Sequence, residues 1–163
     1  MIGYLLNALT GETLLDCRDT DPHTYALYIY DEPGDYIDWH YDTSFYRGKR
    51  FTLLIGLIEN DSCALDCMLH TRDSEKTSES RLYKIKPGSM MVFDGDRLWH
   101  RVTPMAEGDS ARVVLTMEFV TDTSMNPWRK LLSDIKDAFA YFGVREVFFG
   151  PRGRRSPSQD AAL

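Results

Sequence analysis

Short β-rich runs, several of them closed by a turn, are the feature that most limits the folds open to this chain. Four runs end at Pro33-Gly34, Asn60-Asp61, Pro87-Gly88 and Asp94-Gly95, which are typical turn dipeptides. No helical pattern separates the runs, so a parallel sheet built from βαβ units is disfavoured. We predict a mainly β domain, an antiparallel sandwich or jelly roll, with strands over residues 25–30, 37–42, 51–58, 65–69, 81–86, 89–93, 98–102 and 112–120.

One segment near the C-terminus has the pattern of a helix. Asn126 supplies an N-cap and Pro127 a first-turn proline, and Gly143 ends the run. Between them, apolar residues at helical spacing predict a helix over residues 128–142. The strand that opens at Arg112 has a wholly apolar face that needs cover, so we expect this helix to pack on the sheet. A helix lying on a membrane surface is the alternative.

The length and the tail indicate the domain organisation. A chain of 163 residues is long enough for one domain. We expect a single jelly-roll domain over residues 1–150. Residues 151–163 (PRGRRSPSQDAAL) predict a disordered basic tail, because their composition cannot offset the entropy cost of ordering. Residues 73–80 (DSEKTSES) are polar throughout and predict an exposed loop.

The charge balance narrows the classes of partner. There are 19 Lys and Arg against 25 Asp and Glu, a net charge of −6, which disfavours a nucleic-acid binder with a basic face. No run of about 18 apolar residues occurs, and residues 1–10 lack the basic front and cleavage site of a signal peptide. We therefore expect a soluble cytoplasmic protein that binds neither nucleic acid nor a membrane.

The cysteine content agrees with a reducing compartment. Cys17, Cys63 and Cys67 are too few, and odd in number, for a disulfide framework. Cys63 and Cys67 form an isolated CxxxC without a second pair of metal ligands nearby, so packed free thiols are favoured over a zinc site.

Two of the four histidines stand in a metal-binding context. His40 and Asp42 are two residues apart, a spacing that in a strand projects both side chains from one face. His100 follows in the predicted strand 98–102. Two histidines and one carboxylate form the triad that holds non-haem Fe(II) on one face of an octahedron. We predict that His40, Asp42 and His100 are metal ligands and the catalytic centre, the alternative being core histidines with satisfied hydrogen bonds.

Arg112 offers a second binding group. In the strand that it opens, Val114 and Thr116 share its face. Its guanidinium is a planar fork of donors for a carboxylate, which a dicarboxylic acid would present once its other end chelates the metal. A structural ion pair is the alternative, but an unpaired guanidinium on an interior face is costly. We predict that Arg112 binds a cosubstrate carboxylate.

These motifs resemble those of the Fe(II)/2-oxoglutarate-dependent dioxygenases, in particular the prolyl-hydroxylase-like branch. The resemblance covers residues 25–119 and rests on the HxD, the distal histidine, the downstream arginine and their neighbours. The neighbouring matches are Tyr30, the strand Phe51-Thr52-Leu53-Leu54, the run Pro87-Gly88 with Val92-Phe93-Asp94, the segment Val102, Pro104, Gly108 and Arg112, and Thr116.

The resemblance implies a cupin-like double-stranded β-helix that hydroxylates its substrate with Fe(II), 2-oxoglutarate and O₂, with ascorbate as a candidate reductant. It also implies that Arg112 and Tyr30 bind 2-oxoglutarate and that Thr116 lines the pocket; for Tyr30 the alternative is strand packing. The expected substrate is a small molecule, a free amino acid among the candidates, or a peptide residue. The alternative function is a cupin-like metal or small-ligand binding protein without oxygenase activity, and a third is a scaffold that binds a partner.

Two features depart from the family pattern. Gly56 stands where relatives have a tyrosine, and Asp61-Ser62-Cys63 replaces the Gly-Gly pair that follows it, so we expect a different wall for the cosubstrate site. Only 39 residues precede His40, fewer than in relatives. The chain is therefore a minimal member or a fragment, and its sheet would be supported by the C-terminal helix or by a second chain in a homo-oligomer.

Overall fold

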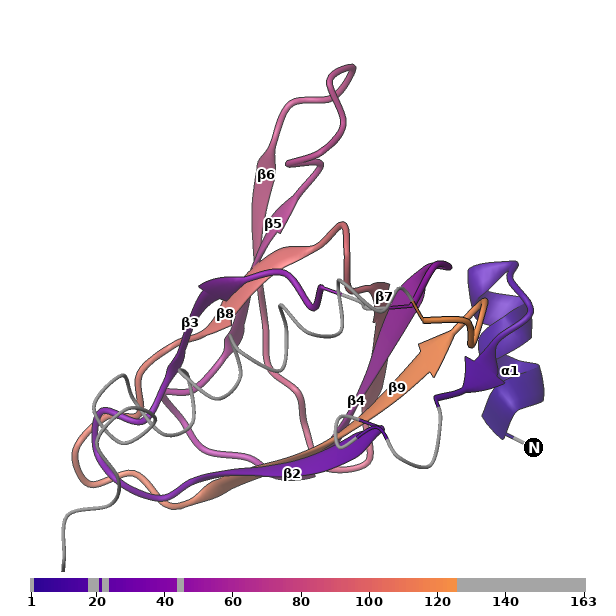
Figure 1. The fold of residues 1–163 in the computed structure, drawn as a ribbon. Helices are drawn as coiled ribbons and strands as arrows, with labels where there is room; N and C mark the ends of the chain where they lie inside the picture. The colour runs from indigo at the N-terminus through magenta and orange to yellow at the C-terminus, as the bar shows by residue number, and fades with distance from the viewer. Residues whose placement is uncertain (1, 18–20, 22–23, 44–45, 126–163) are drawn as a thin grey trace, which may run out of the picture. The chain divides into compact units, whose positions relative to one another are not determined.

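A computed structural model describes residues 2–17, 21, 24–43 and 46–125. The helix predicted over residues 128–142 and the tail predicted over residues 151–163 lie outside this part of the chain. One helix and nine strands occupy the described residues (Figure 1). In chain order they are α1 (Ile2–Thr10), β1 (Leu15–Asp16), β2 (Tyr25–Tyr30), β3 (Ile37–His40), β4 (Arg50–Ile58), β5 (Leu65–Leu69), β6 (Glu79–Tyr83), β7 (Met90–Asp94), β8 (Trp99–Val102) and β9 (Arg112–Val120).

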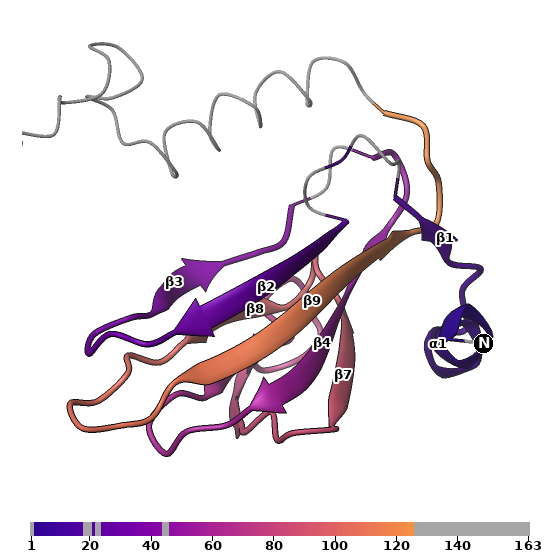
Figure 2. The same ribbon diagram turned by 90° about the horizontal axis from the view of Figure 1, so that it is seen from below.

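The strands form two antiparallel sheets. The five-stranded sheet has the order β1-β9-β4-β7, with β2 also paired to β9, and the four-stranded sheet has the order β3-β8-β5-β6. Figure 2 shows β9 running between β2 and β4. The prediction of a mainly β, jelly-roll domain is confirmed.

The main core joins residues of both sheets. It includes Leu54 and Val114 from the five-stranded sheet and Leu65 and Val102 from the four-stranded sheet. Cys63 and Cys67 are buried free thiols in the same core, as the sequence predicts. The pocket described below lies between the two sheets, and all of its lining residues except Asp42 belong to strands.

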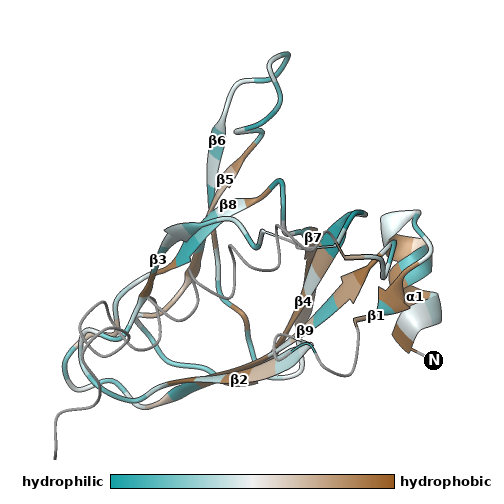
Figure 3. Cartoon of the chain, viewed as in Figure 1, coloured by the Kyte–Doolittle hydropathy of each residue, from teal (hydrophilic) through white to brown (hydrophobic). Residues whose placement is uncertain are grey.

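A second core lies under α1, a helix that the sequence analysis did not predict. Leu6 is 1% exposed and packs with Phe51, Leu53 and Phe119. Figure 3 shows the apolar character of α1. This helix therefore covers part of the apolar face of β9, a role that the sequence analysis gave to the helix over residues 128–142. Gly11, with φ +72°, adopts the left-handed conformation just after α1.

Five predicted strands have other bounds in the structure: β4, β7 and β8 differ by one residue at one or both ends, and β3 and β6 differ more. β3 ends at His40 rather than at residue 42, and β6 spans Glu79–Tyr83 rather than residues 81–86. After β6 the chain passes close to Gly56, where a Cβ would lie 2.1 Å from the carbonyl oxygen of Lys86. Only glycine allows this approach, which gives a physical reason for its departure from the family pattern.

Candidate metal centre and its pocket

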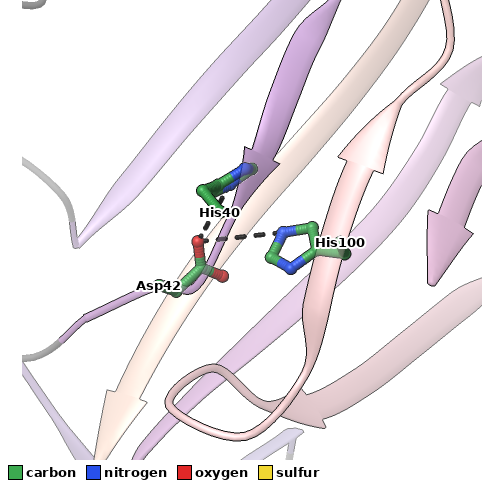
Figure 4. A group of neighbouring side chains, drawn as sticks. All are labelled: His40, Asp42 and His100. Atoms are coloured by element: carbon green, nitrogen blue, oxygen red, sulfur yellow. Dashed lines mark ion pairs between the residues drawn. The ribbon is translucent and has the colours of Figure 1, made fainter. Parts of the chain in front are cut away.

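The three predicted metal ligands lie together. Figure 4 shows His40, Asp42 and His100 pointing toward one another from the end of β3, the segment after it, and β8. Oδ1 of Asp42 is 3.4 Å from Nε2 of His40 and 3.8 Å from Nε2 of His100. One ligand atom from each residue lies within 4.8 Å of the others. No other group of three or more His, Cys, Asp or Glu residues gathers in this way within the residues that the structure describes.

Each histidine is oriented by its second ring nitrogen. Nδ1 of His40 lies 2.7 Å from the carbonyl oxygen of Asp38, and Nδ1 of His100 lies 3.0 Å from that of Leu98. A carbonyl oxygen only accepts, so each Nδ1 carries the hydrogen and donates it. In the neutral rings Nε2 then carries the lone pair, on the side of Asp42. Carbonyl partners of this kind fix the tautomer and orientation of metal-binding histidines.

Asp42 lies outside the strand ladder and is fixed by hydrogen bonds. Its backbone amide donates to the carbonyl oxygen of Gly95 at 3.0 Å. Oγ1 of Thr52, a buried residue of β4, donates to Oδ2 at 2.6 Å. This leaves Oδ1 as the oxygen nearest the two histidines. The carboxylate is therefore anchored from the opposite sheet, by a threonine to which the sequence analysis gave no role.

The electrostatics of the site favour the ligand forms. Burial raises the pKa of the Asp42 carboxyl, but the close contact with His40, the nearby His100 and the hydrogen bond from Thr52 outweigh it and hold the pKa well below its usual range. Burial lowers the pKa of His100. At neutral pH the site thus presents a carboxylate and a neutral His100 ring, the forms in which these groups bind a metal ion.

All six predicted site residues line one pocket between the sheets. It has an empty volume of about 510 Å³, including the space open to solvent. The six residues are Tyr30, His40, Asp42, His100, Arg112 and Thr116.

Arg112 is a buried cation for which the described residues supply no anion. It is 3% exposed and lies opposite Tyr30 in the β2–β9 ladder, with Cζ 4.9 Å from the centroid of the tyrosine ring. Within the described part of the chain, no carboxylate forms an ion pair with Arg112. A buried guanidinium without an anion is unfavourable. The structure therefore favours a ligand carboxylate over the structural ion pair that the sequence left open.

Tyr30 and Thr116 complete the wall beside Arg112. Burial raises the pKa of Tyr30 to about 12, although Arg112 opposes the rise, so its phenol keeps its proton at neutral pH and can donate. Oγ1 of Thr116 donates to the carbonyl oxygen of Ala26 at 3.2 Å. Because its proton is engaged in this hydrogen bond, the Thr116 hydroxyl can offer the pocket only an acceptor.

A charged pair that the sequence analysis missed also lies at this pocket. Glu118 of β9 lines the pocket and forms an ion pair with Arg50 of β4. Burial raises the pKa of Glu118 to about 7, against the effect of Arg50. The two residues are far apart in the sequence and meet only because β4 pairs with β9. Their spacing along the sequence therefore gave no indication of the ion pair.

Comparison with known proteins shows a likeness in fold. No family model matches the sequence, and no curated protein matches it. A prolyl-4-hydroxylase from Pseudomonas putida has 18% identity and a TM-score of 0.50 over 63% of this chain and 54% of its own. AviO1 from Streptomyces viridochromogenes Tue57 has 19% identity and a TM-score of 0.57 over 77% of this chain and 59% of its own. SnoN, a non-haem α-ketoglutarate-dependent epimerase from nogalamycin biosynthesis, has 13% identity and a TM-score of 0.55 over 73% and 52%.

This chain has the fold of these proteins. The predicted resemblance to the Fe(II)/2-oxoglutarate-dependent enzymes is confirmed at the level of the fold, α-ketoglutarate being another name for 2-oxoglutarate. The chain spans 54% and 59% of the length of the first two. Among the described residues, no helix is long and apolar enough to cross a membrane.

Proposed function

We propose that this protein is an Fe(II)- and 2-oxoglutarate-dependent oxygenase that hydroxylates a C–H bond of a small molecule or of a peptide residue. The single observation that carries the proposal is the pairing of two features in one pocket. The His-Asp-His cluster and the buried Arg112, which forms no ion pair within the described part of the chain, line the same cavity. A chelating dicarboxylic acid would bind a metal ion at the cluster with one end and would place the carboxylate at its other end against Arg112.

The donor set fits a divalent metal ion. Bonds of roughly 2.0–2.2 Å to imidazole and carboxylate place two ligands of one ion at most about 4.4 Å apart. The two distances to Asp42 Oδ1, 3.4 and 3.8 Å, lie within this limit, and the whole set, within 4.8 Å, meets it after a small side-chain adjustment. Three protein ligands leave open positions on an octahedral ion. His40, Asp42 and His100 would hold Fe(II), and Arg112 and Tyr30 would hold the far carboxylate of 2-oxoglutarate.

When bound, Fe(II) and 2-oxoglutarate supply the oxidising chemistry, in which O₂ and 2-oxoglutarate become CO₂, succinate and the hydroxyl group added to the substrate. The protein needs no nucleophile or general base for this. The chain's own residues fix the ligands through Asp38, Leu98 and Thr52. Arg112 on β9 would orient the cosubstrate. Apolar lining residues such as Leu54 and Val114 would limit the access of water to the pocket.

The test is an anaerobic titration followed by a turnover assay. Fe(II)-loaded protein should develop the visible charge-transfer band of chelated 2-oxoglutarate, and with O₂ it should release succinate. Asp42→Ala should lose both signals because it removes a metal ligand. Glu75→Ala, which changes an exposed carboxylate in the polar segment 73–80 that does not line the pocket, should retain both. Metal binding without the band or succinate would favour the cupin-like binding protein instead.

A further inference from the structure

Glu118 lies at the metal end of the pocket. It is on the pocket-lining face of β9, with Arg112, Val114 and Thr116 at alternate positions. Its partner across the β4–β9 ladder is Thr52, whose hydroxyl donates to the Asp42 carboxylate. The register therefore places Glu118 beside the His-Asp-His cluster, whereas Arg112 lies six residues, about 20 Å, away along the strand.

One oxygen of the Glu118 carboxylate is anchored. Oε1 pairs with Nη2 of Arg50, and the side chain is 11% exposed. Nη1 of Arg50 donates in turn to the carbonyl oxygen of Thr43 at 3.0 Å. Arg50 is itself buried, at 8% exposure. The carboxylate is thus held in a fixed position by a cation that is also fixed.

The other oxygen has no protein partner. In the described residues, Oε2 of Glu118 forms neither a hydrogen bond nor an ion pair. Nε of Arg50 is the one buried side-chain nitrogen or oxygen there that lacks a hydrogen bond. Oε2 is therefore not sealed inside the protein but accessible, in a residue that lines the pocket. The pocket offers a carboxyl group in a fixed position, with one free acceptor oxygen, next to the metal cluster.

The cosubstrate does not need this acceptor. On the proposed function, on which the present inference rests, 2-oxoglutarate lies between the metal cluster and Arg112, and Glu118 lies beyond the cluster. A carboxylate would also repel the two carboxylates of the cosubstrate. The remaining molecule that must come to the metal is the primary substrate.

We propose that Glu118 binds a protonated amine of the primary substrate and so selects substrates that carry a free amino group. An ammonium group has only donors and a positive charge, and it forms a charge-assisted hydrogen bond with an accessible carboxylate oxygen. An anionic group at the same place would face Glu118 and Asp42 together, a like-charge arrangement that costs binding energy.

The experiment compares free amines with their acylated forms. The probes are the twenty free L-amino acids of proteins and their N-acetyl derivatives, and the readout is the initial rate of succinate formation by Fe(II)-loaded full-length protein. In the parent, at least one free amino acid should stimulate the rate tenfold more than its N-acetyl form. Glu118→Gln should lower this ratio at least tenfold, mainly through KM, since the amide keeps the shape but loses the charge.

Glu107→Gln makes the same chemical change at an exposed residue and should keep the parent's ratio. Glu118→Asp, which keeps the carboxyl group, should retain the preference for the free amine with a higher KM. This variant is the test of the proposal if Glu118→Gln does not fold. The inference is overturned if no free amino acid stimulates succinate formation more than its N-acetyl form. It is also overturned if folded Glu118→Gln keeps the preference.

The charge-transfer titration separates this outcome from failure of the proposed function. If Fe(II)-loaded parent protein does not give the visible band with 2-oxoglutarate, the oxygenase assignment itself is wrong. If the band forms and the amine preference is missing, only the role of Glu118 is wrong.

Discussion

His40 lies directly opposite His100 across the β3–β8 ladder, and the centroids of their rings are 4.2 Å apart. Ile37 in the same strand lies opposite Val102, so β3 holds one residue more than β8 between the two pairs. Without this bulge the partner of His40 would be Trp99, whose side chain belongs to the other face. The bulge therefore brings both imidazoles to the pocket side, in line with the tendency of bulges to re-aim side chains beside functional sites.

The first prediction concerns Gly95, the residue that supports Asp42. A Cβ at Gly95 would lie 2.7 Å from Cβ of Asp42 and 3.3 Å from Oγ1 of Thr52. Gly95→Ala should displace the carboxylate and lower the affinity for Fe(II) by about 10- to 100-fold, the usual effect of losing a supporting contact at a metal site. Anaerobic isothermal titration calorimetry measures it.

Gly3→Ala is the matched control, because nothing lies within 4 Å of a Cβ at Gly3 in α1. It should leave the Fe(II) affinity unchanged and stabilise the protein by roughly 0.5–1 kcal/mol, as alanine does over glycine in a helix. Equal Fe(II) affinities for the two variants would show that Asp42 does not depend on Gly95.

Much of the fold could be predicted because its signals are local. The alternating runs and turn dipeptides gave β2, β5 and β9 their observed bounds. α1 was not predicted, since its first turn has no acidic residue and its last turn no basic one. Its apolar residue Leu6 finds its place only through Phe51 and Phe119, which come later in the chain.

The candidate site could likewise be predicted only where its signals are local. The HxD spacing and His100 named the three residues that the structure brings together, but for a partly wrong reason. Asp42 shares no strand with His40; it is placed by Thr52 and Gly95. These contacts, the β3 bulge and the Arg50–Glu118 pair arise from pairing between distant strands, which local sequence patterns do not encode.

The second prediction concerns α1 as part of the core. Leu6→Ala should lower the free energy of unfolding by about 2 to 5 kcal/mol, the cost of a cavity at a buried leucine, because Leu6 is 1% exposed against Phe119. Leu9→Ala, at a side chain that is 65% exposed, should change it by no more than about 0.5 kcal/mol. Urea denaturation measures both. Equal effects would mean that α1 does not pack on the sheet.

The third prediction concerns the buried thiols. Burial raises the pKa of both Cys17 and Cys67 to about 12, and Cys63 is also buried. The native protein should therefore not react with iodoacetamide at pH 8, whereas in urea-unfolded protein all three cysteines should be alkylated. Mass spectrometry counts the alkylated cysteines. Rapid native labelling of Cys67, which lies opposite His100 in the β5–β8 ladder, would contradict the core around the site.

The same thiols give a pH dependence of stability. Above pH 9 a thiol in the unfolded state loses its proton, while the same thiol in the folded state keeps it. The unfolded state is therefore stabilised relative to the folded state as the pH rises. The free energy of unfolding should fall as pH rises from about 9 toward 12, with no contribution from these groups below that window. The fall should be smaller in Cys17→Ala. An unchanged slope in this variant would mean that Cys17 is not buried as a neutral thiol.

The last prediction concerns Arg112 and the cosubstrate. Arg112 is buried, forms no ion pair among the described residues and is not a member of the metal-ligand cluster, so Arg112→Ala should leave Fe(II) binding largely intact while weakening 2-oxoglutarate. Breaking a buried ion pair from one side costs about 3 to 5 kcal/mol, which corresponds to a loss of roughly two to four orders of magnitude in affinity. Arg112→Lys should restore only part of this, because it keeps the charge but loses the planar fork of donors.

Anaerobic titration of Fe(II)-loaded protein with 2-oxoglutarate, followed by the visible band of the chelate, measures the affinity of each variant. Arg101→Ala is the control, because it removes a guanidinium that is already paired, with Asp66 at 2.9 Å, and that does not line the pocket. It should bind 2-oxoglutarate as the parent does. If Arg112→Ala also binds it as tightly as the parent, the far carboxylate is held elsewhere, and the pocket is better explained as a cupin-like metal site whose buried arginine serves another anion.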